Sequence, residues 1–432
     1  MRALAILLLA LCGVLPGMAA QADDDATAVI RFIRAYGSKD ERMPPVVLMD
    51  SPTTSQQIIG AQFATVEFDV QAATIPNLYA RLVHCTADWE DDPNGFVNDV
   101  MNRTSLFDWK VAPQRSSYFN YRGALQIPND QIQIRFSGNY KVRIYDISTD
   151  KLLAETRIFV VQPMAEMQFN FMTDFYEPRF KVSSIALTLE AVVRTQSASL
   201  ISNLLNTVVL YRNARWYEPF IISERLQTIT NPPQSSTYVG GLFAGGKVFR
   251  IERIPAENEY RILDLSNMAL FPNTGQPVRL PLSDLRRNGS FLQRTDDGVM
   301  TTSMISSYND EYVPIEFILD PLPYPSELDV FVVGSFNNWR PDRTWQMYYD
   351  EETRLYRLRQ WVRRGIHNYM YASGTYNIDN GEFKDFTFEE FEGNTASAGH
   401  GFVAFAYYRM QDYGGYDGII AVGNTNIYQS GR

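Results

Sequence analysis

Residues 137-SGNYKVRIY-145 carry the pattern that decides the predicted fold. Gly138 can take a positive φ where the chain enters a strand. From Tyr140 to Ile144 every second residue is apolar or aromatic, and the residues between them are basic. Because successive side chains of a strand point to opposite faces, one row is expected in a core and the other toward solvent. The stretch therefore predicts a half-buried strand of a β-sandwich.

The same alternation recurs in other parts of the chain. It is clear in 167-MQFNFM-172 and in 185-IALTLEAVV-193, and no helical-period stretch has comparable length. A Tyr such as Tyr140, near the start of a late strand, is typical of the tyrosine corner of immunoglobulin-like sandwiches, where its hydroxyl caps a crossing loop. The prediction is an all-β protein of tandem immunoglobulin-like or early-set sandwiches.

Prolines suggest where one sandwich ends and the next begins. The strand 157-RIFVVQ-162 stops at Pro163, and 320-DPLPYPSELD-329 has alternate prolines, which favour a stiff connector. The predicted domains are residues 27–163, 164–320 and 326–432.

The N-terminus and the charge restrict the class of protein. The segment 1-MRALAILLLALCGVLPGMAAQADDD-25 has a basic residue, a short apolar run and small residues, which predicts a signal peptide over residues 1–20. The formal charge is −10, and without a basic stripe no nucleic-acid partner is expected. The sequence thus indicates an exported, acidic protein that does not span a membrane.

Residue types that carry chemistry are few. Cys85 is the one cysteine after the signal peptide, and its neighbour His84 would point to the other face of a strand, so the two cannot form a catalytic pair. The acidic run 88-DWEDDPNGFVND-99 departs from a calcium loop, because Met101 stands where a bidentate Glu belongs. No catalytic residue, cofactor or metal ion is expected, and an enzyme is the weakest of the three function classes considered.

The third predicted domain resembles early-set modules that bind starch or glycogen. The resemblance lies in 330-VFVVGSFNNW-339 and 365-GIHNYMYASG-374. By that resemblance Trp339 and Tyr376 would form a stacking platform for a sugar, while Met370 replaces the module's basic residue. Asn337 and Asn338 also suit a tight turn, after which Trp339 would pack on the sandwich instead.

A broader resemblance covers nearly the whole chain after the signal peptide and keeps its order. The chain resembles the plug protein family of the type IX secretion system in the following segments: 79-YARLVHCTADWEDD-92, 121-YRGALQIPNDQIQIRFSGNYKVRIYD-146, 208-VVLYRNARWYEPF-220, 365-GIHNYMY-371 and 404-AFAYYRM-410.

This second resemblance implies a non-enzymatic plug. Such a protein would lie in the periplasm at the inner face of the outer membrane and seal the translocon barrel when cargo is absent. Two aromatic, turn-rich loops, 89-WEDDPNGF-96 and 411-QDYGGYDG-418, are the predicted partner contacts, through Trp89, Asp91, Asp92, Tyr413 and Tyr416. The alternative is a periplasmic glycan-binding protein that uses Trp339 and Tyr376.

Overall fold

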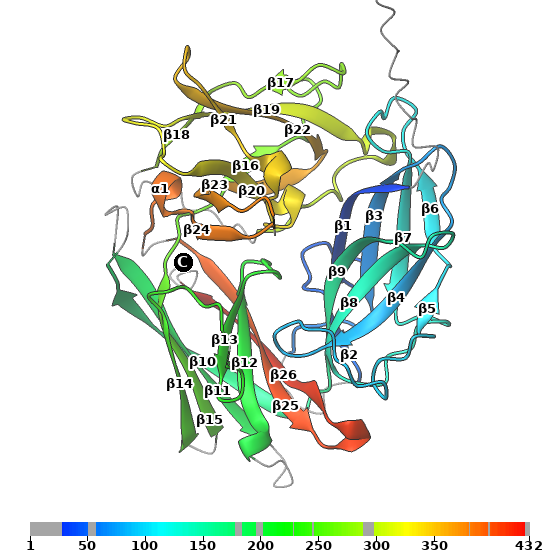
Figure 1. Ribbon diagram of the computed structural model, residues 1–432, viewed down its shortest axis with the longest axis vertical. Coiled ribbons are helices and arrows are strands. Elements are labelled where there is room, and N and C mark those ends of the chain that lie inside the picture. Colours follow the sequence, from blue (N-terminus) through cyan, green and yellow to red (C-terminus); the bar gives the residue numbers. More distant parts are fainter. Residues whose placement is uncertain are drawn as a thin grey trace, which may run out of the picture.

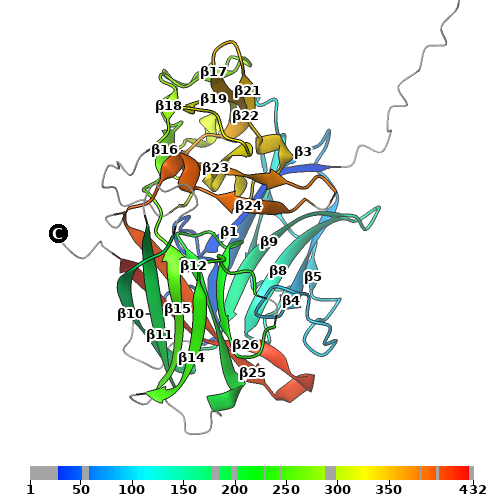
Figure 2. The ribbon, with the colours of Figure 1, turned by 60° about the vertical axis from the view of Figure 1, so that its left-hand side comes forward.

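The computed structural model describes residues 28–50, 58–177, 184–195, 202–227, 229–243, 246–287, 298–379, 381–395 and 398–427. The predicted signal peptide lies outside these residues. The regular secondary structure of the described residues is almost entirely strand, which confirms the all-β prediction. Three sandwiches lie around a common centre, as Figures 1 and 2 show.

The first sandwich packs a sheet in the order β1-β3-β7-β6 against the strands β9, β8, β4 and β5, with β2 beside β9. Side chains from both sheets, including Phe68, Val142 and Ile158, form its buried core. The bounds are β1 (Val29–Gly37), β2 (Val46–Leu48), β3 (Ala64–Gln71), β4 (Leu78–Cys85), β5 (Arg103–Thr104), β6 (Asp108–Val111), β7 (Tyr121–Ile127), β8 (Gly138–Asp146) and β9 (Leu152–Val161).

The predicted tyrosine corner is confirmed in this sandwich. Tyr140 is buried, and its hydroxyl donates a hydrogen bond of 2.9 Å to the backbone oxygen of Phe136. Gly138, directly before it, has φ +142°, as expected for the glycine at this strand start.

The second sandwich packs the sheet β10-β11-β15-β14 against β13-β12-β25-β26. The bounds are β10 (Ala165–Phe175), β11 (Ile185–Thr195), β12 (Leu205–Arg212), β13 (Pro219–Ser223), β14 (Ser236–Phe243), β15 (Gly246–Pro255), β25 (His400–Met410) and β26 (Tyr416–Ile427), with the 3-10 turns η1 (Ser202–Leu204) and η5 (Asp412–Gly414). The strand β26 pairs with β9 at Ile419 and Val161, so one nine-stranded sheet runs from the first sandwich into the second.

The third sandwich packs β16, β23, β20 and β24 against β17, β18, β19, β22 and β21. The bounds are β16 (Arg261–Asp264), β17 (Val278–Arg279), β18 (Asp284–Leu285), β19 (Tyr312–Asp320), β20 (Asp329–Gly334), β21 (Tyr348–Asp350), β22 (Leu355–Arg363), β23 (Ile366–Tyr376) and β24 (Phe383–Thr387), with the helix α1 (Glu389–Glu392) and the 3-10 turns η2 (Ser307–Asn309), η3 (Ser335–Asn337) and η4 (Arg343–Trp345).

These sheets correct two of the predicted domain boundaries. Residues 261–320 were assigned to the middle domain, but β16 pairs with β23 and β19 pairs with β22, so these strands belong to the third sandwich. The hairpin of β25 and β26 was assigned to the last domain, but β25 pairs with β12 in the second. The prolines after Asp320 lie in a loop between two strands of one sandwich and do not mark a domain boundary. The boundaries follow from which strands pair, and composition does not reveal that pairing.

Candidate functional site

The two loops predicted as partner contacts meet at one end of the molecule. Asn94 Nδ2 donates hydrogen bonds to the backbone oxygens of Tyr413, at 2.7 Å, and Gly415, at 3.1 Å. The ring of Phe136 lies 5.0 Å from that of Tyr413. In Figure 1 the end of the β25–β26 hairpin lies beside the loop after β4. We call Asn94, Phe96, Phe136, Tyr413 and Gly414 the tip surface.

Two aromatic side chains of the tip surface face solvent. Phe96 is 74% exposed and Tyr413 is 62% exposed. Large apolar side chains this open are unusual when they gather, and they mark places where another molecule can bind. Asp91 is also exposed. It forms ion pairs with Lys141 at 2.9 Å and with Arg143 at 2.6 Å, so its charge is balanced within the protein.

The other predicted contact residues are not available to a partner. Trp89 is only 4% exposed, and its Nε1 donates a hydrogen bond of 2.7 Å to the Tyr211 hydroxyl of the second sandwich. Tyr416 is buried with its ring against His84 and Phe136. The partner-contact prediction is therefore wrong for Trp89 and Tyr416, because both aromatic rings join sandwiches inside the molecule.

Asp92 is buried as well, and it is the carboxylate that lies beside His84. Asp92 Oδ2 lies 3.2 Å from His84 Nδ1, while His84 Nε2 lies 3.2 Å from the backbone oxygen of Ser137. Burial alone would raise the pKa of Asp92, but interactions with His84 and the Asn94 amide outweigh it and hold that pKa below its usual value. His84 thus serves packing, and Cys85, in the apolar cluster between the first two sandwiches, does not face it.

Buried charges lock the first sandwich to the third. Arg363 Nη1 lies 2.6 Å from Glu67 Oε1, and Arg363 Nε lies 3.1 Å from Asp310 Oδ1. The Tyr312 hydroxyl donates a hydrogen bond of 2.8 Å to Asp69. Burial alone would raise the pKa of Glu67, but the charge of Arg363 and that of Arg34 hold it well below its usual value.

The sequence did not reveal this network, because its members lie far apart along the chain. A basic residue at a strand end, such as Arg363, does not by itself predict a buried ion pair. Only the spacing of Glu67 and Asp69 in β3 indicates that two carboxylates lie on the same face of that strand. Their burial becomes visible only when the third sandwich covers that face.

Trp339 and Tyr376 do not form the open stacking platform for a sugar that the sequence resemblance predicted. Trp339 is only 3% exposed, its Nε1 donates a hydrogen bond of 2.8 Å to the Gly298 oxygen, and its ring lies 4.6 Å from that of Tyr260. Asn338 and Trp339 both have positive φ, which is the tight turn that the sequence suggested. The half-buried Tyr376 packs on Phe383 of β24 instead of standing free beside Trp339.

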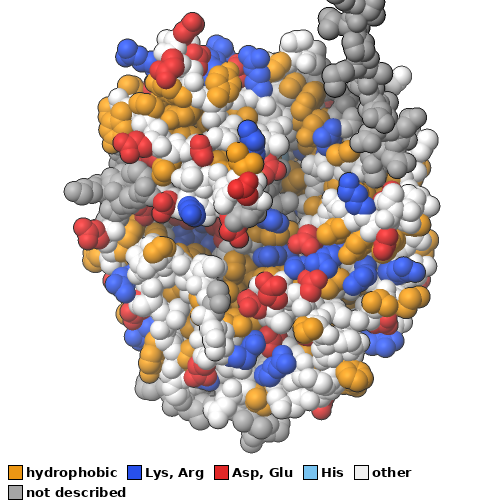
Figure 3. Space-filling view, in the orientation of Figure 1, with side chains coloured by type: hydrophobic (Ala, Val, Ile, Leu, Met, Phe, Trp, Pro, Cys, Tyr) orange, Lys and Arg blue, Asp and Glu red, His pale blue; other side chains and the backbone are white. Residues whose placement is uncertain are grey.

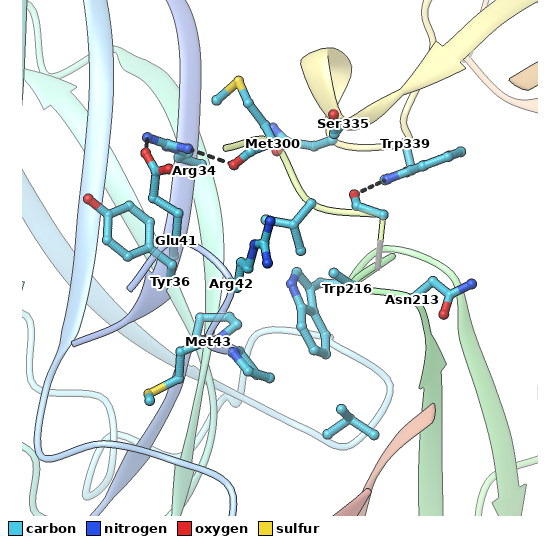
Figure 4. Close-up of a pocket in the computed structure, with 18 of the residues that line it drawn as sticks. Arg34, Tyr36, Glu41, Arg42, Met43, Asn213, Trp216, Met300, Ser335 and Trp339 are labelled. Carbon is cyan, nitrogen blue, oxygen red and sulfur yellow. Dashed lines mark hydrogen bonds and ion pairs between the residues drawn. The ribbon is translucent and has the colours of Figure 1, made fainter. Parts of the chain in front are cut away.

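A cavity of about 450 Å³ lies where the three sandwiches meet. Figure 4 shows Arg34, Tyr36 and Arg42 on one side, with Trp216 and Asn213 opposite and Met300 and Ser335 above. A larger cavity, of about 1080 Å³, opens beside it and shares Tyr217, Asn338 and Trp339 with it. Elsewhere among the described residues, no group of three His, Cys, Asp or Glu side chains is placed to hold a metal ion.

The fold and these features define a class: a protein of three joined β-sandwiches with an aromatic tip and a cavity where the sandwiches meet. Residues 30–162 match the family model described as type 9 secretion system plug protein 1st domain. This match confirms the resemblance predicted from the sequence, and it assigns residues 30–162 to the first domain of type IX secretion plug proteins.

One solved structure has the same architecture over most of its length. A hypothetical protein from Parabacteroides merdae ATCC 43184 superposes with a TM-score of 0.68 at 18% sequence identity, over 92% of this chain and 97% of that one. At this identity the likeness concerns the fold alone. No curated protein matches the chain. None of the helices in the described parts is long and apolar enough to cross a membrane.

Proposed function

We propose that this chain is a non-enzymatic plug, which closes the periplasmic mouth of the type IX outer-membrane translocon when no cargo occupies the channel. The observation that carries the proposal is the match of its first domain to the plug family. The family implies a role in type IX secretion and association with an outer-membrane component of that system. Sealing, the periplasmic location and the translocon barrel as the direct partner are the parts proposed here.

A plug needs to keep its shape under load, and the contacts between sandwiches support this role. Apolar residues from the first and second sandwiches share one buried cluster, in which the rings of Phe159 and Phe405 stack 4.0 Å apart. The backbone amide of Gln162 also donates to the Ile419 oxygen at 3.0 Å, so the chain passes into the second sandwich without a free linker. A body joined in this way resists the domain motions expected of sandwiches tethered by linkers.

The tip surface is the proposed contact with the translocon. Phe96 and Tyr413 supply exposed rings. Asp91, which is paired with Lys141 and Arg143, is the other predicted contact residue that stays exposed. A specific interface needs more than about 1,000 Å² of buried surface, so the tip would be the centre of a broader contact. Because a plug must also leave the channel, we expect a polar rim and exchange between states of the translocon instead of a permanent apolar interface.

The experiment compares variants in the native host. The double variant Phe96→Asp with Tyr413→Asp is expected to lower co-purification of the translocon with the plug by about tenfold, because charges replace exposed rings. The matched control is Leu282→Asp with Met304→Asp, which changes two equally open apolar side chains of the third sandwich and should co-purify normally.

Deletion of the gene should also raise leakage of a periplasmic marker through the outer membrane. A deletion strain without leakage, together with a wild-type protein that never co-purifies with the translocon, would refute sealing. Normal co-purification of the Phe96 and Tyr413 variant would refute only the tip as the contact.

Glycan binding remains a prediction with less support. The buried ring of Trp339 offers no open face for a sugar, whereas Tyr376 is half-buried and partly accessible. A glycan array probed with the wild-type protein and with Tyr376→Ala tests it. Retention that Tyr376→Ala abolishes would support the alternative, and absence of retention by the wild type would dismiss it.

A further inference from the structure

The arginines around the junction cavity divide into two kinds. Arg34 is paired with Glu41 at 2.7 Å and with Glu67 at 2.9 Å. Arg42 and Arg157 also line the cavity, and neither forms an ion pair with any residue that the structure describes. Glu41 is the one acidic residue among the described lining, and Arg34 already neutralises it. The cavity therefore has surplus positive charge.

Arg157 is held in place without a carboxylate. Its Nη1 donates a hydrogen bond of 2.8 Å to the Trp216 oxygen, and its guanidinium lies 4.2 Å from the centre of the Trp89 ring. Its Nε is buried and has no hydrogen-bond partner in the described structure. Buried polar groups usually have partners, so this guanidinium, which also has no carboxylate beside it, lacks part of its usual set of acceptors.

A further arginine, Arg340, shares an aromatic neighbour with Arg157. Arg157 and Arg340 both stack on Tyr217, with their guanidinium carbons 4.4 and 4.6 Å from the ring centre. Burial lowers the pKa of Arg157, and the charge of Arg340 lowers it further. Arg340 likewise has no ion pair among the described residues. Both guanidinium groups therefore add positive charge beside Tyr217, and neither has an ion pair among the described residues.

The rest of the lining suits an organic molecule. Trp216 projects into the cavity in Figure 4, and Asn213, Asn424 and Asn426 also line it. A space of about 450 Å³ falls in the usual range for small-molecule sites. Figure 3 shows basic and acidic side chains side by side near the middle of the face on which the sandwiches meet.

We propose that the junction cavity binds a small organic carboxylate, whose oxygens accept hydrogen bonds from Arg157 and Arg42 while its body lies against Trp216. Planar guanidinium groups match carboxylate geometry, which gives the site its preference. Arg340 strengthens binding through its charge at the side of Tyr217. Because Arg42, Trp216 and Met300 come from different sandwiches, the ligand contacts all three and stabilises their arrangement.

The test uses the purified chain from residue 21 onward and isothermal titration calorimetry. The probes are D-glucuronate, trialanine with a free C-terminus, trialanine amide and inorganic phosphate. Binding of D-glucuronate alone would identify a free organic acid, whereas binding of trialanine but not of its amide would identify a peptide C-terminus. Each result supports the site and separates the two sources of the carboxylate.

Variants locate the binding. Arg157→Gln keeps a donor for the Trp216 oxygen and should weaken binding of the carboxylate probe about tenfold or more, since hydrogen bonds to charged groups contribute most of such affinities. Arg42→Gln, at an exposed position that can be changed without disturbing a core, should weaken it severalfold. The control Arg354→Gln, in an exposed turn of the third sandwich, should bind like the wild type.

Three outcomes would overturn the proposal. The first is no binding of either carboxylate by the wild type at millimolar concentration. The second is unchanged binding by folded Arg157→Gln and Arg42→Gln, with thermal denaturation used to establish folding. The third is phosphate bound as tightly as both carboxylates, because that would remove the role given to Trp216.

Discussion

Asn94 donates to the backbone of Tyr413 across 319 positions of the chain, and this contact joins a loop of the first sandwich to the hairpin end of the second. A second hydrogen bond, to the Gly415 oxygen, fixes the same turn. Tyr413 has φ +52°, a conformation that residues with a side chain rarely adopt, so this turn benefits from support by the neighbouring loop. The exposed ring of Tyr413 is therefore presented by Asn94.

Asn94→Ala should loosen this turn without unfolding the protein. The two backbone oxygens lie near the surface, so water can replace the donor, and we expect a loss of about 1 kcal/mol in the free energy of unfolding. Amide hydrogen exchange of residues 412–415 should become markedly faster. The exposed control Glu351→Ala should change neither quantity, and unaltered exchange in Asn94→Ala would contradict the proposed support.

The buried charges between the first and third sandwiches predict a graded series. Arg363→Met leaves Glu67 and Asp310 buried with fewer cations, so we expect a loss of about 3–5 kcal/mol in unfolding free energy. Tyr312→Phe removes one hydrogen bond to Asp69 and should cost about 1–3 kcal/mol. Urea denaturation followed by intrinsic fluorescence measures both.

A double variant separates pairing from packing in this network. If Arg363 acts mainly by neutralising Glu67, Glu67→Gln should recover part of the stability that Arg363→Met loses. Losses that simply add, with no recovery, would show that the two side chains contribute independently.

Two buried histidines predict how stability depends on pH. Burial lowers the pKa of His367 from 6.5 to about 4, and burial followed by the charge of Arg212 lowers that of His400 to about 3. The unfolded chain therefore binds protons from about pH 6.5 downward, while the folded protein resists them. The stability that the two neutral histidines contribute is complete above pH 6.5 and falls as the pH drops toward 4.

The contribution of each histidine can be measured by substitution. At pH 4 His367 is protonated in the unfolded chain but only partly in the folded protein. This difference lowers the free energy of unfolding by roughly 3 kcal/mol. His367→Gln keeps a donor for the Arg363 oxygen, which lies 2.7 Å from His367 Nε2, and should clearly reduce the slope of stability against pH between 6.5 and 4. An unchanged slope would show that His367 titrates normally in the folded protein.

Local features of the chain were predictable, and pairings between distant segments were not. Gly138 and Tyr140 act within a few residues of one another, so the pattern around them was sufficient to predict the corner. Trp89 looked like an exposed aromatic residue in an acidic loop, because nothing near it in sequence shows that Tyr211 covers it. The hairpin at residues 400–427 joins β12 through contacts about 200 residues apart, which alternation alone does not specify.

Gly138 gives the sharpest test of the joint between the first two sandwiches. A Cβ atom at this position would lie 2.8 Å from the Asp417 backbone oxygen and would also meet the His84 ring, and φ is +142°. Because both the backbone conformation and the close approach of β26 exclude a side chain, Gly138→Ala should lose about 3 kcal/mol of stability and expose Tyr416. Gly95 is the matched control, because a Cβ atom added there would meet no atom within 4 Å beyond its chain neighbours and its φ is not in the positive region. Gly95→Ala should leave stability unchanged or raise it by about 0.5 kcal/mol, since it restricts the unfolded chain. Urea denaturation followed by tyrosine fluorescence measures the unfolding free energy of both variants. Equal stability of the two would mean that β26 does not approach the start of β8 closely enough to exclude a side chain.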